Sequence, residues 1–209
     1  MNFHEIVSQL ILDTRGDVAG GPWSFSATSS IGLFLPEIAL CATIVLMLFV
    51  RVFSWGRRID VFSLALAGSI LAFFLAAVDA PVVSERVEFF TGMLVYDSFS
   101  VYMRSLLLLF LVLLVLLTKL TGIPTRADAA DVYTLVLGAT LGMCLMISAN
   151  HLMTVFLAVE MASVPSYALV ALMKRRPRAS EAALKYAVYG AATAGVMLYG
   201  ISLIAGMVN

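Results

Sequence analysis

The sequence predicts an all-α protein, a polytopic membrane helix bundle of about six transmembrane helices. Three observations carry this prediction. Of the 209 residues, 62% are hydrophobic and 12% are charged, and the mean hydropathy is +1.02. Soluble domains contain about 45–50% apolar and about 25% charged residues, so a single soluble core cannot bury so many apolar side chains. Finally, the apolar residues gather into runs of roughly 20, the length that a helix needs to cross a bilayer.

The chain divides into an N-terminal segment, 1–30, and a transmembrane bundle, 31–209. Apolar residues near the start recur at helical spacing on one face, which predicts a short interfacial helix followed by a Gly/Ser-rich linker over 16–30. The predicted transmembrane helices are 31–53, 59–78, 99–119, 132–149, 151–172 and 182–205. The fourth and fifth are separated only by Asn150, which predicts a tight helical hairpin. No strand-like alternation appears between these runs.

Small residues at a spacing of four indicate close helix packing. Gly138 and Gly142 form a GxxxG pattern on the fourth predicted helix. On the sixth, Gly190 precedes Ala194 and Ala191 precedes Gly195 in the same way. Small side chains allow helix backbones to approach in lipid, where no hydrophobic force draws helices together. These residues therefore predict helix–helix contacts and no chemistry.

The basic residues predict an orientation, because cytoplasmic loops of membrane proteins are enriched in Lys and Arg. One set of alternating loops receives nine of them: Arg51, Arg57, Arg58, Lys119, Arg126, Lys174, Arg175, Arg176 and Arg178. The other set receives only Arg15 and Arg86. The sequence therefore predicts that the N-terminus lies outside, and six crossings return the C-terminus to the outside.

Several function classes find no support in the sequence. The formal net charge is zero, from 13 basic and 13 acidic residues, which argues against a nucleic-acid partner. Cys41 and Cys144 lie far apart in apolar runs and match no metal-ligand spacing, so they are interpreted as small buried hydrophobes. No nucleophile constellation, phosphate loop or nucleotide fingerprint is present, and we expect no metal site and no catalytic centre in this chain.

Glu160 is the strongest functional candidate. It lies about nine residues into the fifth predicted helix, roughly 13 Å from the start of that helix. A charge near the bilayer centre costs about 2.5–3.5 kcal/mol on insertion scales, so such residues are functional candidates by default. Pro165 has no N–H and leaves the carbonyl of Met161 without its helical partner, which weakens the turn beside the carboxyl group. The alternative is a protonated Glu160 that donates a hydrogen bond to another helix.

Lys185 is a second candidate. It lies near the start of the sixth predicted helix, and Glu181 precedes it by four residues in the favourable order for an ion pair. It can extend to the interface or pair with Glu181. Lysine is also the cation whose pKa burial shifts most readily, which suits a proton relay. From the residues alone, both interpretations remain open.

Three weaker candidates lie close to predicted helix ends. Glu37 follows Pro36 and is most simply a carboxylate stabilised by the dipole of a helix N-terminus. Arg104 lies similarly close to the outer end of the third helix. His151 begins the fifth helix, where it is either a proton-entry residue or a solvated loop histidine.

From Gly138 onward the residues resemble the antiporter-like membrane subunits of respiratory complex I, and specifically the subunit N family of bacterial NADH:quinone oxidoreductase. The similar runs are ATLGM at 139–143, SAN at 148–150, SVPSYAL at 163–169, SEAALKY at 180–186 and LYGIS at 198–202. The run LPE at 35–37 and the pairs GM at 92–93 and YD at 96–97 resemble the family less specifically. The resemblance covers most of 35–206.

The resemblance implies that Glu160 and Lys185 belong to a polar chain that carries protons. The helical rise places them roughly 18 Å and roughly 6 Å from the inner face, so water or a helix offset must bridge the gap. The implied cofactors, NADH and quinone, are used by other subunits and not bound by this chain. The implied partners are other complex I membrane subunits in a bacterial inner membrane.

Members of the family are about twice as long and contain a second inverted repeat. We therefore expect this chain to correspond to the first part of the fold, with a second polypeptide supplying the remaining helices if the gene is split. Two alternatives remain: a subunit of a multi-subunit sodium/proton antiporter, and a structural membrane fragment that does not pump.

Overall fold

The computed structural model describes residues 30–52, 60–79, 86–90, 92–122, 128–172 and 177–208. The predicted interfacial helix, and the predicted linker up to its last residue, lie outside the described residues. The helices of the bundle are α3 (Leu35–Val52), α4 (Val61–Asp79), α5 (Ser98–Thr121), α6 (Ala129–Ser148), α7 (Leu152–Ala171) and α8 (Pro177–Val208). Each overlaps one predicted helix, so the predicted bundle is confirmed. Across the described ranges, five helices are long and apolar enough to cross a membrane, and α4 contains the shorter apolar stretch Val61–Ala77.

The first predicted helix is in fact two helices, because α2 (Ser30–Leu33) ends before α3 begins. A single helix through Pro36 would lose the hydrogen bond to the carbonyl of Gly32, and the proline ring would clash with that carbonyl. The chain bends at Phe34 instead, and the Phe34 carbonyl accepts the first bond of α3 from the Ile38 N–H at 3.1 Å.

A short β-hairpin that the sequence did not predict precedes α5. Its strands β1 (Val87–Phe89) and β2 (Leu94–Tyr96) pair antiparallel, with Glu88 opposite Val95. Phe90 and Gly92 adopt positive φ angles of 52° and 79° in the connection, a backbone conformation that tight turns between strands require. Three residues per strand are too few for alternation to be recognised in a sequence, so the hairpin was missed.

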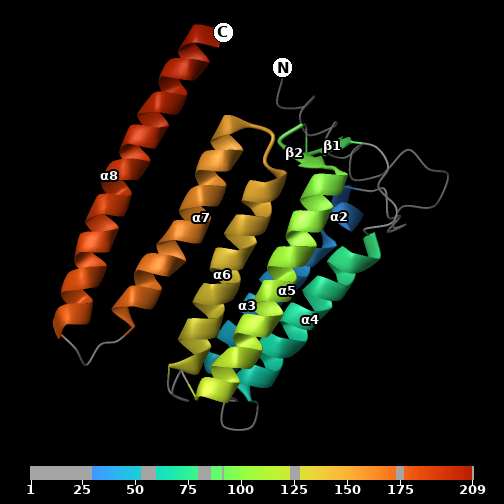
Figure 1. The fold of residues 1–209 in the computed structure, drawn as a ribbon, viewed down its shortest axis with the longest axis vertical. Helices are drawn as coiled ribbons and strands as arrows, with labels where there is room; N and C mark the ends of the chain where they lie inside the picture. The colour runs from blue at the N-terminus through green and yellow to red at the C-terminus, as the bar shows by residue number, and fades with distance from the viewer. Residues whose placement is uncertain are drawn as a thin grey trace.

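The hairpin is joined to the turn between α6 and α7. The Asn150 backbone N–H donates to the Met93 carbonyl at 2.9 Å, and the Asn150 side chain donates to the Gly92 carbonyl at 2.9 Å. Arg86 in turn donates to the Asn150 side-chain oxygen at 3.1 Å. We call this part of the bundle, where β1, β2 and the α6–α7 turn meet, the hairpin end (Figure 1).

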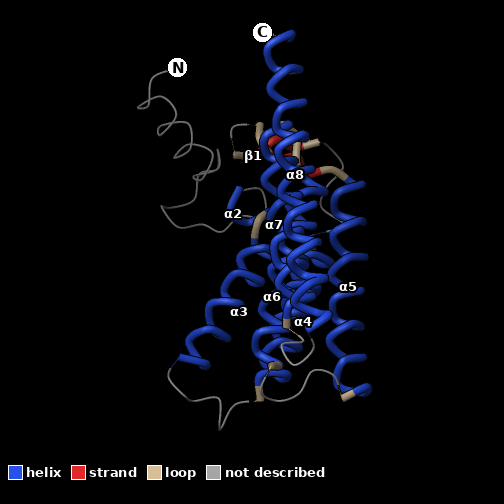
Figure 2. The backbone as a smooth tube through the Cα atoms, turned by 90° about the vertical axis from the view of Figure 1, so that its left-hand side faces the viewer, coloured by secondary structure: helices blue, strands red, loops and turns tan. Residues whose placement is uncertain are grey.

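The core lies between four helices, with α6 in contact with α3, α4, α5 and α7. Figure 1 shows α8 at the edge of the bundle, beyond α7, and Figure 2 shows the end of α3 diverging from the other helices. The buried core residues are Ala39, Leu40 and Met47 of α3; Ala65, Ala72 and Ala76 of α4; Leu108, Leu111 and Val115 of α5; and Tyr133, Leu137, Leu141 and Cys144 of α6. The main contacts of α8 are with α7, and among its described residues only Ala183 is buried. The bundle is therefore closed around α6 and open at α8.

The predicted glycine contacts are confirmed in part. Gly142 touches the backbone of α7, as the predicted tight hairpin of these helices requires, whereas a side chain at Gly138 would make only ordinary contact with Pro165. The hydroxyl end of Tyr167 occupies the space that a side chain at Gly190 would need, and Gly195 faces open space. The α6–α7 contact is thus a backbone contact at one glycine.

Charged groups also join helices at the end opposite the hairpin. Arg51 at the end of α3 forms an ion pair with Asp131 in the first turn of α6. Lys119 lies over the ring of Phe62, with its ammonium nitrogen 4.3 Å from the ring centroid. These contacts fix two basic residues at the end of the bundle opposite the hairpin. The side of the membrane on which this end lies stays a prediction.

Replacing Asp97 with alanine is expected to destabilise the start of α5 by about 1 kcal/mol. Its carboxylate accepts the Ser100 backbone N–H at 2.7 Å, and the Ser100 hydroxyl accepts the Asp97 N–H at 2.9 Å. The hydrogen bond from the Ser100 backbone lowers the pKa of Asp97 below 3.8, so this stability is present above pH 3.8 and is lost as the pH falls through the lower value. Thermal unfolding in detergent checks this, with Asp97→Asn, which keeps an acceptor, as the control. An equal loss in both variants would contradict it.

Candidate functional site

Glu160 lies in the middle of α7, next to the contact with α6. Its neighbours along the helix, Ala158 and Ala162, bring the α7 backbone against Gly142. The Glu160 side chain is half-buried. It forms no hydrogen bond or ion pair with any residue that the structure describes, which distinguishes it from Glu37, Glu88 and Glu181.

The segment around Pro165 is polar, although α7 continues through it as one helix. The Ser163 hydroxyl donates to the Val159 carbonyl at 2.8 Å, and the Ser166 hydroxyl donates to the Ser163 carbonyl at 2.6 Å. The proline itself supplies no N–H to the carbonyl of Met161. Backbone and hydroxyl oxygens are therefore available within two turns of Glu160, on a helix that is otherwise apolar.

Lys185 is exposed and paired with Glu181, with 2.6 Å between Nζ and Oε1, as the spacing predicted. The structure does not bring it to Glu160. The register of α7 against α8 is set by Tyr167, whose ring meets that of Tyr186 edge-on with centroids 4.6 Å apart. Tyr167 follows Glu160 by seven residues, roughly 10 Å along the helix. Since Lys185 is adjacent to Tyr186, a gap of about that size separates the two predicted pathway residues.

His151 is the N-cap of α7. Its Nδ1 accepts the backbone N–H of Met153 at 3.2 Å, and the side chain is exposed. This accounts for its position at the start of the helix.

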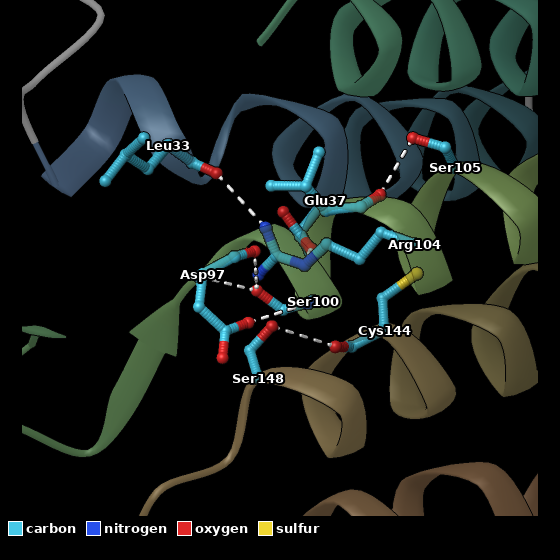
Figure 3. A network of polar contacts seen from close by, with 9 residues as sticks. Leu33, Glu37, Asp97, Ser100, Arg104, Ser105, Cys144 and Ser148 are labelled. Carbon is cyan, nitrogen blue, oxygen red and sulfur yellow. Dashed lines mark hydrogen bonds and ion pairs between the residues drawn. The ribbon is translucent and has the colours of Figure 1, made fainter. Parts of the chain in front are cut away.

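Glu37 and Arg104 form a buried ion pair that the sequence did not predict. The Arg104 Nε lies 3.2 Å from the Glu37 Oε1, and each side chain is 1% exposed (Figure 3). Glu37 does lie in the first turn of α3, as the sequence indicated, but its burial and its pairing with Arg104 were not expected. Each had been judged only against its own helix, and the two residues are 67 positions apart.

One feature of the sequence could have indicated that Glu37 and Arg104 are paired. The first and third predicted helices run parallel, so Glu37 and Arg104 lie near the same end of the bundle. Long side chains on a helix lean toward its N-terminus, which moves the Arg104 guanidinium group closer to the level of Glu37. Opposite charges at matching depth on parallel helices are a reason to expect contact.

Arg104 contacts three elements besides its own helix. Its Nε faces Glu37 of α3, its Nη1 donates to the Leu33 carbonyl of α2 at 3.4 Å, and its guanidinium carbon lies 5.3 Å from the ring centroid of Tyr96 on β2. Tyr96 is 2% exposed and covers the pair from the hairpin side. Figure 3 shows Cys144 and Ser148 of α6 on another side of the pair.

Comparison with known proteins identifies relatives over most of the chain. Residues 149–209 match a family model described as NADH:quinone oxidoreductase/Mrp antiporter, TM. NADH-quinone oxidoreductase subunit N of Chlorobium chlorochromatii is 36% identical over 185 residues, which cover 86% of this chain and 35% of that protein. Subunit N 2 of Sorangium cellulosum is 33% identical over 198 residues, 89% of this chain and 38% of that protein.

A solved structure agrees with these relatives. A chain of respiratory complex I from Thermus thermophilus with bound aureothin superposes with a TM-score of 0.66 and 30% sequence identity, covering 82% of this chain and 36% of that chain. The resemblance inferred from the sequence is confirmed. The chain spans little more than a third of the length of these relatives, less than the half that was expected.

Proposed function

Because the chain is related to subunit N of NADH:quinone oxidoreductase, we propose that it is a membrane subunit of such a complex and carries part of a proton route. Electron transfer from NADH to quinone takes place in other subunits, and this chain has no catalytic centre and binds no cofactor. Its partners are the other membrane subunits, and its location is a bacterial plasma membrane. The relatives continue beyond the matched region, and helices equivalent to that continuation, whichever polypeptide carries them, would cover α8.

Glu160 is the observation that carries this proposal. Its carboxyl group is half-buried in the middle of an apolar helix and has no partner among the described residues. Such a group is costly to insert into a membrane, so it is a functional candidate by default. Carboxyl groups take up and release protons, and the serine hydroxyls around Pro165 offer acceptors to water molecules near it. Glu160 thus has the position and the chemistry of a proton carrier.

Lys185 is the second group of the proposed route. Its position on α8 is separated from that of Glu160 on α7 by roughly 10 Å along the helix axes, so a proton passes between them through water and not directly. Glu181 competes for the same ammonium group, with which it pairs at 2.6 Å. A change in that pair alters the charge that Glu160 senses, which couples the two sites.

Glu160→Gln is expected to lower proton translocation severalfold while NADH oxidation in the presence of an uncoupler continues. Inverted membrane vesicles from cells carrying the variant gene allow both rates to be measured together. Glu88→Gln removes an exposed carboxylate of the hairpin and is the matched control, which is expected to pump normally. An unchanged ratio of protons to electrons in Glu160→Gln would remove this residue from the route.

One observation favours a second function, a subunit of a sodium/proton antiporter, since the matched family model includes the Mrp antiporters. Deletion of the gene separates the two. Loss of NADH-driven proton translocation with normal growth at high sodium supports the respiratory function. Sodium sensitivity with normal NADH oxidation supports the antiporter.

A further inference from the structure

We propose that Glu37 and Arg104 form a second proton-transfer site, at the hairpin end of the bundle, in which Glu37 carries the proton. The inference rests on the proposed proton route and extends it to residues outside the segment that matches the family model, 149–209. The ligand of the site is a proton delivered by water. Arg104 balances the charge of Glu37 and Tyr96 covers the pair.

The burial of the pair is the first argument. Each side chain is 1% exposed in the chain alone, so both charges have lost their water. Replacing a buried ion pair with apolar residues of similar size is often neutral or stabilising, because the attraction barely offsets the lost hydration. Stability of the bundle therefore gives little reason to keep these two charges, and ionisable groups inside membrane helices are functional candidates by default.

The geometry of Arg104 is the second argument. Its Nη1 donates to the Leu33 carbonyl and its Nε lies 3.2 Å from the Glu37 Oε1, but neither Nε nor Nη2 makes a hydrogen bond within the described residues. A guanidinium group with unused N–H donors can hold a water molecule beside the carboxylate. It can also turn away from Glu37 while the Tyr96 ring, 5.3 Å from its carbon, continues to stabilise its charge.

The proton step follows from this arrangement. When Arg104 moves off, the Glu37 carboxylate takes a proton from a hydronium ion, which forms the carboxyl O–H bond and leaves water. When Arg104 returns, its charge favours the carboxylate, and the proton passes back to water. No electron or covalent change other than this O–H bond is involved, because arginine keeps its own proton throughout.

The groups that face the pair are few. Cys41 lies one turn along α3, Cys144 of α6 interacts electrostatically with both partners, and Tyr96 faces it from β2. Asp97 begins α5 but directs its carboxylate to the Ser100 N–H. In the described part of the chain no second carboxylate competes with Glu37 for Arg104.

The hairpin links this site to Glu160. Asn150, which directly precedes the N-cap of α7, donates hydrogen bonds to the carbonyls of Gly92 and Met93. Ala149 forms a β-bridge with Leu94 of β2, and Tyr96 follows on the same strand. A shift of α7 is therefore transmitted through the hairpin to the ring that covers Arg104. This connects protonation on α7 with access of water to Glu37.

The test compares the Glu37→Leu/Arg104→Met double variant with Glu37→Gln and Glu37→Asp in native membranes, together with Glu160→Gln. The double variant is expected to assemble and oxidise NADH as the wild type does, to hold a pH gradient without added leak, and to translocate severalfold fewer protons per electron. Glu37→Gln is expected to pump poorly and Glu37→Asp, which keeps a titratable group, to pump well. Normal pumping by the double variant overturns the proposal, and it leaves the proposed function intact if Glu160→Gln still pumps poorly.

If the double variant does not assemble, chemical labelling of the wild-type complex tests the proposal instead. A membrane-permeant carbodiimide reacts with protonated carboxyl groups, and mass spectrometry locates the adduct. An adduct on Glu37 that forms during NADH turnover, and not in resting membranes, supports the proposal. Its absence under turnover overturns it.

Discussion

An Arg104→Met variant is expected to lose about 3–5 kcal/mol of stability, the cost of leaving one member of a buried ion pair uncompensated. The remaining Glu37 side chain is 1% exposed and would lose the guanidinium group that lies 3.2 Å from its Oε1. Thermal unfolding of the full chain in detergent measures the loss. Arg178→Met, which removes an exposed charge at the start of α8, is the matched control and is expected to unfold as the wild type does.

The same cost is expected to disappear in the Glu37→Leu/Arg104→Met double variant, because both charges are then absent and the volume is retained. The difference between the single and double variants isolates the penalty of the unpaired charge from any loss of packing. A double variant as unstable as Arg104→Met would contradict this account. The loss would then come from the contacts of the guanidinium group with α2 and β2.

Gly142→Ala is the second substitution with a large expected effect. A Cβ at this position would lie 2.6 Å from the Ala162 nitrogen and 2.8 Å from the Met161 carbonyl carbon, and both are backbone atoms that no rotamer change can move. Forcing α6 and α7 apart costs about 1–3 kcal/mol, typical of overpacking. Alanine has the better helix propensity by about 1 kcal/mol, which offsets part of the cost.

The thiol of Cys144 reports this loss directly. It is 1% exposed in the core, so a thiol-reactive dye labels it only when the bundle opens. In a Cys41→Ala background, Gly142→Ala is expected to lower the temperature at which labelling begins. Gly195→Ala is the control, since a Cβ there meets nothing within 4 Å. Equal labelling temperatures for both variants would show that the α6–α7 contact is looser than the structure indicates.

The bundle could be predicted from the sequence because runs of about 20 apolar residues have few other stable arrangements. The features that were missed depend on shorter signals. Pro36 marked the break between α2 and α3, but an apolar run continues across it. The hairpin strands have three residues each, and they are stabilised by bonds to Asn150, which lies more than fifty residues further along the chain.

Part of the candidate site could be predicted from the sequence and part could not. Glu160 was identified from its own helix, because a lone carboxyl group in an apolar run is visible in the sequence. The pair of Glu37 and Arg104 was not, since it depends on how α3 and α5 are placed relative to each other. The separation of Glu160 from Lys185 was expected from the helical rise, and Tyr167 and Tyr186 supply the register that keeps them apart.

The central claim is that the chain is a membrane subunit of an NADH:quinone oxidoreductase. The most direct measurement is purification of the tagged full chain from native membranes in a mild detergent, followed by an assay of NADH oxidation by a quinone. The account predicts that the tag retains a multi-subunit complex with this activity, and that deleting the gene abolishes NADH-driven proton translocation. A tagged chain that purifies with sodium/proton antiport activity, or with no NADH oxidation at all, would contradict it.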